Sequence, residues 1–170
     1  MDLSEMRFPR QLEADGSAEK IREALTVLKT RLRPGGGLEV PVLPVTESLV
    51  NALKKARLQR RIRFGYDEIM EKLAAEKKGI DEVLQKTKSP QTERLSRLLL
   101  FSNDGAGRLY RHIEQTLMEH RLRILGCELD IESTNLGPAI TGGRAGIKVM
   151  LVEHKDAVAD VLRAIIQNGR

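Results

Sequence analysis

Basic side chains gather in one short, acid-free segment of this sequence. The ten residues of this segment include Lys54, Lys55, Arg57, Arg60, Arg61 and Arg63. If residues 46–63 form one helix, several of these cations share a stripe that could lie along the phosphates of a nucleic acid and release their counterions. The apolar stripe Leu49, Leu53 and Ala56 reaches Arg60 at the next four-residue step. We therefore expect the helix to leave the core or break after Ala56, so that the arginines are presented at the surface.

The same basic run has a simpler interpretation. Runs of charge are more often solvated faces, and these cations could pair with Glu68, Glu71 or an acidic partner protein. Phe64 and Tyr66 are the only aromatic residues nearby, and aromatic residues make up only 3% of the chain. This scarcity argues against the stacking platforms of modules that bind single-stranded RNA.

A helix-turn-helix is a related alternative. Helices over residues 80–87 and 92–99, joined by the turn 88–91, would bring four polar side chains near a major groove. These side chains are Gln91, Thr92, Arg94 and Arg97. The turn lacks the usual glycine, and helices at this spacing are far commoner in bundles.

A glycine-containing turn after the apolar run 98–101 is a candidate ligand site. Asn103, Asp104, Gly105 and Arg108 would lie where an α/β sheet places ligands, after a strand and at a helix N-terminus. With Arg144 from a glycine-rich loop and His154 from a strand end, they could hold a small phosphorylated ligand. His154 drops out if its strand runs antiparallel to the one at Leu98. The simpler interpretation is that Asn103 or Asp104 caps a helix.

Residue types that perform catalysis are few. His112 and His120 have no third ligand at metal spacing, Cys127 has apolar neighbours typical of core packing, and nothing resembles a catalytic triad. We expect no metal, no cofactor and no catalytic residue, and we favour a protein that is not an enzyme.

The periodicity predicts an α/β fold with a helical region over residues 1–90 and a compact unit over residues 91–170, or one continuous domain. The expected helices cover 18–33, 46–63 with Thr46 as cap, 67–78, 80–87, 106–120 and 157–166. Residues 38–45 contain two prolines and are expected to be a connector or an edge strand. A helical turn near 90–95 and a strand over 98–101 are favoured over one helix.

The second unit is expected to follow the order strand, helix, strand, strand, helix. Further strands are predicted at 122–132 and 147–153, and the residues between them form a long loop. The first two strands of this three-stranded sheet are expected to be parallel. The alternative is an α+β fold with a helical bundle and a two- or three-stranded antiparallel sheet.

Composition narrows the class of protein. The chain has 170 residues, 29 Lys and Arg against 24 Asp and Glu, and one cysteine. Without a signal peptide, a membrane span or a disulfide, a soluble cytoplasmic protein is expected. The leading hypothesis is a nucleic-acid-binding or regulatory protein that uses the basic helix. The alternatives are a protein-interaction or oligomerisation module, including a homo-oligomer, and a sensor or enzyme for a small phosphorylated ligand.

Overall fold

A computed structural model describes residues 3–87 and 93–167 of the chain. This part of the chain forms seven helices and six strands. In chain order they are α1 (Arg10–Ala14), α2 (Ser17–Thr26), β1 (Lys29–Arg31), β2 (Glu39–Leu43), α3 (Glu47–Leu58), β3 (Ile62–Phe64), α4 (Tyr66–Thr87), β4 (Arg97–Phe101), α5 (Gly107–Glu119), β5 (Ile124–Leu129), α6 (Ser133–Thr141), β6 (Val149–Val152) and α7 (Lys155–Ile166).

The strands form one mixed sheet in the order β1-β2-β5-β4-β6-β3. β5 pairs in parallel with both β2 and β4, whereas β6 runs antiparallel to β4 and to β3. The predicted α/β class is confirmed, as is the parallel pairing of β4 with β5. The predicted three-stranded unit is too small, because the first ninety residues contribute β1, β2 and β3 to the same sheet.

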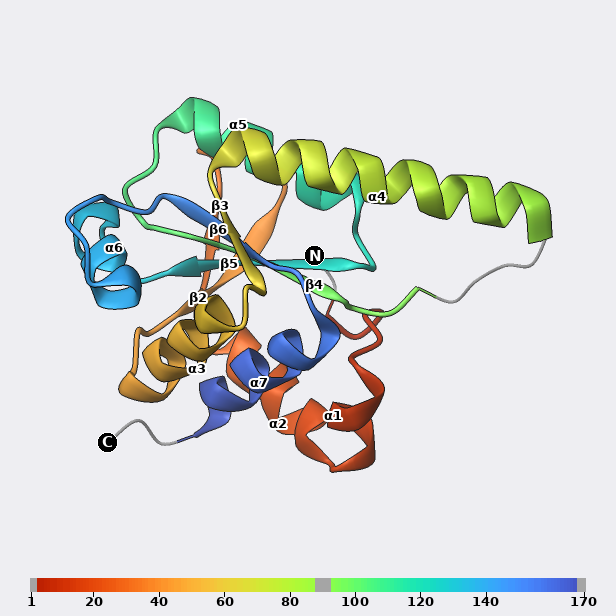
Figure 1. Ribbon diagram of the computed structural model, residues 1–170, viewed down its shortest axis with the longest axis horizontal. Coiled ribbons are helices and arrows are strands. Elements are labelled where there is room, and N and C mark those ends of the chain that lie inside the picture. The colour runs from red at the N-terminus through yellow and green to blue at the C-terminus, as the bar shows by residue number, and fades with distance from the viewer. Residues whose placement is uncertain (1–2, 88–92, 168–170) are drawn as a thin grey trace.

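Helices cover both faces of the sheet (Figure 1). One face packs against α1, α2, α3, α6 and α7, and the other against α4 and α5. The side chains of β4 alternate between the two cores: Leu98 and Leu100 face the first, Leu99 and Phe101 the second. A central strand buried on both faces reads as a continuous apolar run, and this confirms the strand predicted at 98–101.

The segment between α2 and α3 differs from its prediction. The helix expected over 18–33 ends at Thr26, and β1 follows as the outer strand of a hairpin with β2. β2 is not an edge strand, because it lies between β1 and β5. Pro41 is tolerated there because the pairing with β5 begins only at Val42, whose N–H donates to Leu28 on the other side.

Three further elements depart from the sequence analysis. Residues 67–87 belong to the single helix α4, in which Gly79 is an interior residue rather than a stop. The loop expected after β5 contains α6, and β3 was not predicted. In α6, a Cβ on Gly137 would lie 1.8 Å from the carbonyl oxygen of Ala145. The glycine thus allows the following loop to cross this helix closely. The helix was not predicted, because the glycine and the proline in its interior are poor helix formers.

The helix-turn-helix alternative is contradicted. β4 occupies residues 97–101, where the second helix was required, and Arg97 is paired in the sheet with Ile124. The predicted turn 88–91 lies outside the described residues, and of the helical turn predicted near 90–95 only residues 93–95 are described, where the chain is not helical.

Candidate nucleic-acid interface

The basic helix predicted over residues 46–63 is shorter in the structure. α3 ends at Leu58, before Arg60, Arg61 and Arg63. Thr46 caps α3 as predicted, with its hydroxyl oxygen accepting from the Leu49 N–H at 3.2 Å. Arg60 then adopts a left-handed conformation with φ of 59°, the only non-glycine residue with positive φ among those described. Continued helix would carry Arg60 into the core, so the chain turns after Leu58 instead.

The turn has the hydrogen bonds of a Schellman motif. The N–H of Arg60 donates to Arg57 O and the N–H of Arg61 to Ala56 O, each at 2.9 Å. Glycine is the usual residue at the left-handed position, because it has no Cβ to clash with the backbone. Here an arginine holds that position.

The structure divides the six predicted cations into two groups. Lys55 lies 3.5 Å from Asp160, and Arg63 forms an ion pair with Glu153 that raises the pKa of the guanidinium. The other four make no ion pair with any acidic side chain in the described part of the chain. We call these four the α3-turn cluster: Lys54, Arg57, Arg60 and Arg61.

The α3-turn cluster is open to solvent. Lys54, Arg57 and Arg60 are exposed and Arg61 is half-buried. Leu58, between them in sequence, has 78% of its surface exposed. Arg61 leads directly into β3, an edge strand, so the cluster sits at one margin of the sheet.

Five of the six residues predicted to hold a phosphorylated ligand lie beyond the opposite end of β3, and His154 is the exception. Asp104 accepts hydrogen bonds from the Ser133 N–H at 3.0 Å and from the Ser133 hydroxyl at 2.8 Å. It therefore caps α6, whereas the N-cap of α5 is Ala106. The Asn103 amide donates to Asp130 at 3.3 Å, and the Gly105 N–H donates to the Tyr110 hydroxyl at 2.9 Å. These contacts give Asn103, Asp104 and Gly105 structural roles.

A cavity of about 460 Å³ lies at the same end of the sheet. It is lined by Phe64, Gly65, Tyr66, Leu109, Ser133, Gly146, Ile147, Lys148 and Val149. Burial raises the pKa of the Tyr66 hydroxyl, while the nearby positive charge of Arg108 acts in the opposite direction. Arg144 is exposed on the loop between α6 and β6. Tyr66 and Lys148 were not predicted as site residues, because only the fold brings β3 beside β6.

His154 lies at the other end of the sheet from this cavity. β6 runs antiparallel to β4, so residues that follow β6 emerge opposite the residues that follow β4. The His154 Nδ1 atom accepts from the Asp156 N–H at 3.1 Å and caps α7. The structure therefore separates His154 from Asp104, Arg108 and Arg144.

The remaining candidate catalysts have structural surroundings. Cys127 is fully buried, and burial raises the pKa of its thiol. His112 contacts the Tyr66 ring edge-on, and burial followed by the charge of Arg123 lowers the pKa of His120. Among the described residues no group of three or more His, Cys, Asp or Glu side chains could hold a metal ion. No described helix is long and apolar enough to span a membrane.

The fold and the site together define a mixed α/β protein. Its six-stranded sheet lies between two helical layers, and an exposed cationic turn lies at one margin of the sheet.

No family model and no curated protein sequence matches the chain. Among solved structures, a protein of unknown function from Bacillus halodurans is similar with a TM-score of 0.50 and 13% identity, covering 72% of this chain and 100% of that one. A 15.5 kD RNA-binding protein from Giardia lamblia has a TM-score of 0.45 and 16% identity, covering 69% and 81%. The first similarity describes a shared fold alone, and the second is too distant to carry an argument.

Proposed function

We propose that this protein binds nucleic acid, without catalysis, through the α3-turn cluster. The observation that carries the proposal is Arg60. An L-residue in the left-handed region costs roughly 1–2 kcal/mol, and a glycine would remove that cost. Strained residues cluster at functional sites, so a positively charged side chain at a strained position points to a role for that charge in binding.

The arrangement of the cluster suits a phosphate backbone. Lys54 and Arg57 are three residues apart on α3 and therefore share a face, and Arg60 and Arg61 follow from the turn. Since no described acidic side chain neutralises them, each is available for a phosphate. Contacts to phosphates position a protein on its nucleic acid but do not read bases, so we expect binding with little sequence preference.

The test is the salt dependence of binding. Fluorescence anisotropy with labelled RNA and DNA of one sequence, single-stranded and duplex, should detect binding that weakens steeply as salt rises. Replacing Arg57, Arg60 and Arg61 together by alanine should flatten the plot of log K against log[salt] for duplex DNA by up to about 2.7, or about 0.9 for each phosphate contact.

A control with the same loss of charge isolates the surface. Lys20, Lys29 and Arg111 are exposed cations on other elements, and alanine at all three should leave most of the binding and its slope in place. Absence of binding to all four probes at low salt would refute the proposal. So would an equal effect of the two triple variants, because net charge alone would then explain the binding.

A second candidate function is recognition of a small phosphorylated ligand in the cavity near Lys148. It is favoured by the cavity itself, which lies where α4, α5 and α6 all begin and where Arg108 and Lys148 supply positive charge. A panel of nucleotides and sugar phosphates should then raise the melting temperature. Lys148→Ala should abolish that rise and His154→Ala, at the other end of the sheet, should not. If Lys148→Ala instead weakens binding of the nucleic-acid probes while the α3-turn variant does not, the nucleic-acid surface is at the cavity.

A further inference from the structure

The helix α4 is longer than the body that it covers. Ile69 and Leu73 are buried against the sheet, but no residue from 74 to 86 is fully buried. At 1.5 Å per residue the 22-residue helix is about 33 Å long, and its second half projects past the rest of the molecule (Figure 1). Helices without tertiary packing are marginal in water, and this half also contains Gly79, a poor helix former with open space around it. The projecting half therefore lacks the tertiary packing that stabilises most helices in proteins.

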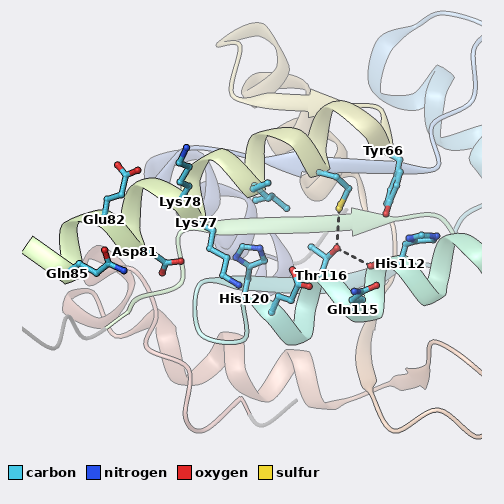
Figure 2. A pocket seen from close by; sticks show the side chains of 14 residues that line it. Tyr66, Lys77, Lys78, Asp81, Glu82, Gln85, His112, Gln115, Thr116 and His120 are labelled. Atoms are coloured by element: carbon cyan, nitrogen blue, oxygen red, sulfur yellow. Dashed lines mark hydrogen bonds between the residues drawn. The ribbon is translucent and has the colours of Figure 1, made fainter.

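One face of the projecting half is continuous with a groove. The groove, about 600 Å³ in volume, lies between α4 and α5 (Figure 2). The second half of α4 lines it with Lys77, Lys78, Asp81, Glu82 and Gln85, next to Ala74. These positions recur at three and four residues and so share one helix face. None of the four charged side chains makes an ion pair with another residue in the described ranges.

The order of charge along this face is self-complementary. Two lysines, Lys77 and Lys78, precede two acids, Asp81 and Glu82, and the midpoint falls between residues 79 and 80. A two-fold axis at that midpoint places residue 78 opposite 81, 77 opposite 82 and 74 opposite 85. We propose that α4 pairs antiparallel with α4 of a second copy of this chain, with Lys78 facing Asp81 of the second copy and Lys77 facing its Glu82.

The pairing also accounts for the groove and the projection. In an antiparallel pair with this register, the end of each α4 at Thr87 reaches residue 72 of the other copy, so it passes over the part of the groove that Leu73 and Ala74 line. The small side chain of Ala74 leaves room for Gln85 of the second copy. Each copy thus covers the same part of the groove of the other, as a two-fold interface requires.

The charges of the groove select this occupant over others. A parallel pair would oppose lysine to lysine and acid to acid. Nucleic acid is disfavoured because Asp81, Glu82 and Glu119 all line the groove. The interface is separate from the α3-turn cluster, which lies on the other helical layer, so it does not depend on the proposed nucleic-acid binding.

Sedimentation equilibrium on the full chain at low salt tests the pairing. The wild type should show a mass about twice 19.1 kDa that falls towards 19.1 kDa as salt is raised. The variant Lys77→Glu/Lys78→Glu should be monomeric under the same conditions, because its dimer dissociation constant should be at least tenfold higher than that of the wild type. The variant Asp81→Lys/Glu82→Lys should be monomeric as well.

Mixing the two variants provides the decisive result. Equimolar amounts should recover a dimer, because all charges at the interface are then opposite again, and the quadruple variant should dimerise alone. Lys20→Glu/Lys29→Glu, with the same change in net charge elsewhere, should remain dimeric. A wild type that is monomeric at every concentration and salt would overturn the proposal. So would a dimer that survives the reversal of Lys77 and Lys78, or a mixture of the two variants that stays monomeric.

Discussion

Replacing Arg60 by glycine should stabilise the protein and weaken its binding at the same time. Arg60 holds the left-handed position of the turn after α3, where its φ is 59°. Relief of that conformation is worth roughly 1–2 kcal/mol. Glycine gives back about 0.5–1 kcal/mol through its greater freedom in the unfolded chain. The net gain is about 0.5–1 kcal/mol, because the hydrogen bonds of the turn involve the backbone alone.

For a domain of this size, such a gain raises the melting temperature by about 1–4 °C. The measurements are calorimetry or urea unfolding for stability, and anisotropy with a nucleic-acid probe for binding. The salt slope of duplex binding should fall by about 0.9 because one phosphate contact is lost.

Arg60→Ala separates the two effects. Alanine has a Cβ and keeps the left-handed strain, so this variant should lose the same affinity with no gain in stability. Backbone strain at Arg60 is refuted if Arg60→Gly is less stable than Arg60→Ala. A phosphate contact by Arg60 is refuted if Arg60→Gly is more stable and binds nucleic acid as well as the wild type does.

Two further predictions concern stability away from the cluster. Gly137→Ala should destabilise the protein by about 1–3 kcal/mol in urea unfolding, because its Cβ would lie 1.8 Å from the Ala145 carbonyl oxygen, and an unchanged midpoint would show that the loop moves freely. Glu76 pairs with Arg97 at 3.3 Å and with Arg123 at 2.5 Å. Glu76→Gln should lower the free energy of unfolding by about 3 kcal/mol. An unchanged free energy of unfolding would refute this role. Burial alone would raise the pKa of the Glu76 carboxyl, but the hydrogen bond and charges of the two arginines outweigh it and lower that pKa. The stability from this carboxylate is therefore present above its unfolded pKa and lost as pH falls through the lower folded value, so acid unfolding of Glu76→Gln should show a smaller pH dependence than wild type.

Much of the local structure was readable from the sequence. The cap at Thr46, the strand predicted at 98–101 and the helices α5 and α7 follow from side-chain chemistry and hydrophobic period. The conflict between the apolar stripe of α3 and Arg60 correctly indicated that the helix could not continue with its arginines against the core. The manner of its ending, a left-handed arginine, was not readable, because the sequence has no glycine there to mark a turn.

The short elements β1, β3 and α6 were not predicted from the sequence, because contacts with distant parts of the chain stabilise them. β1 and β3 have three residues each and exist because β2 and β6 supply their hydrogen bonds. α6 carries Gly137 and Pro138, which weaken any helical pattern, and it is held by the Asp104 cap and by its packing against the loop before β6. Gly79 was expected to end a helix, but no tertiary contact requires a stop there.

The sequence by itself determined the α/β class, the excess of positive charge and the acid-free segment that carries it, because these depend on composition and on periods of a few residues. Only the tertiary structure decided which cations remain available. Asp160 and Glu153 are distant in sequence, yet they lie against Lys55 and Arg63 and reduce six candidates to the four of the α3-turn cluster. It likewise decided that His154 leaves the cavity end of the sheet, since strand direction depends on pairing across the sheet and not on the residues of the strand itself.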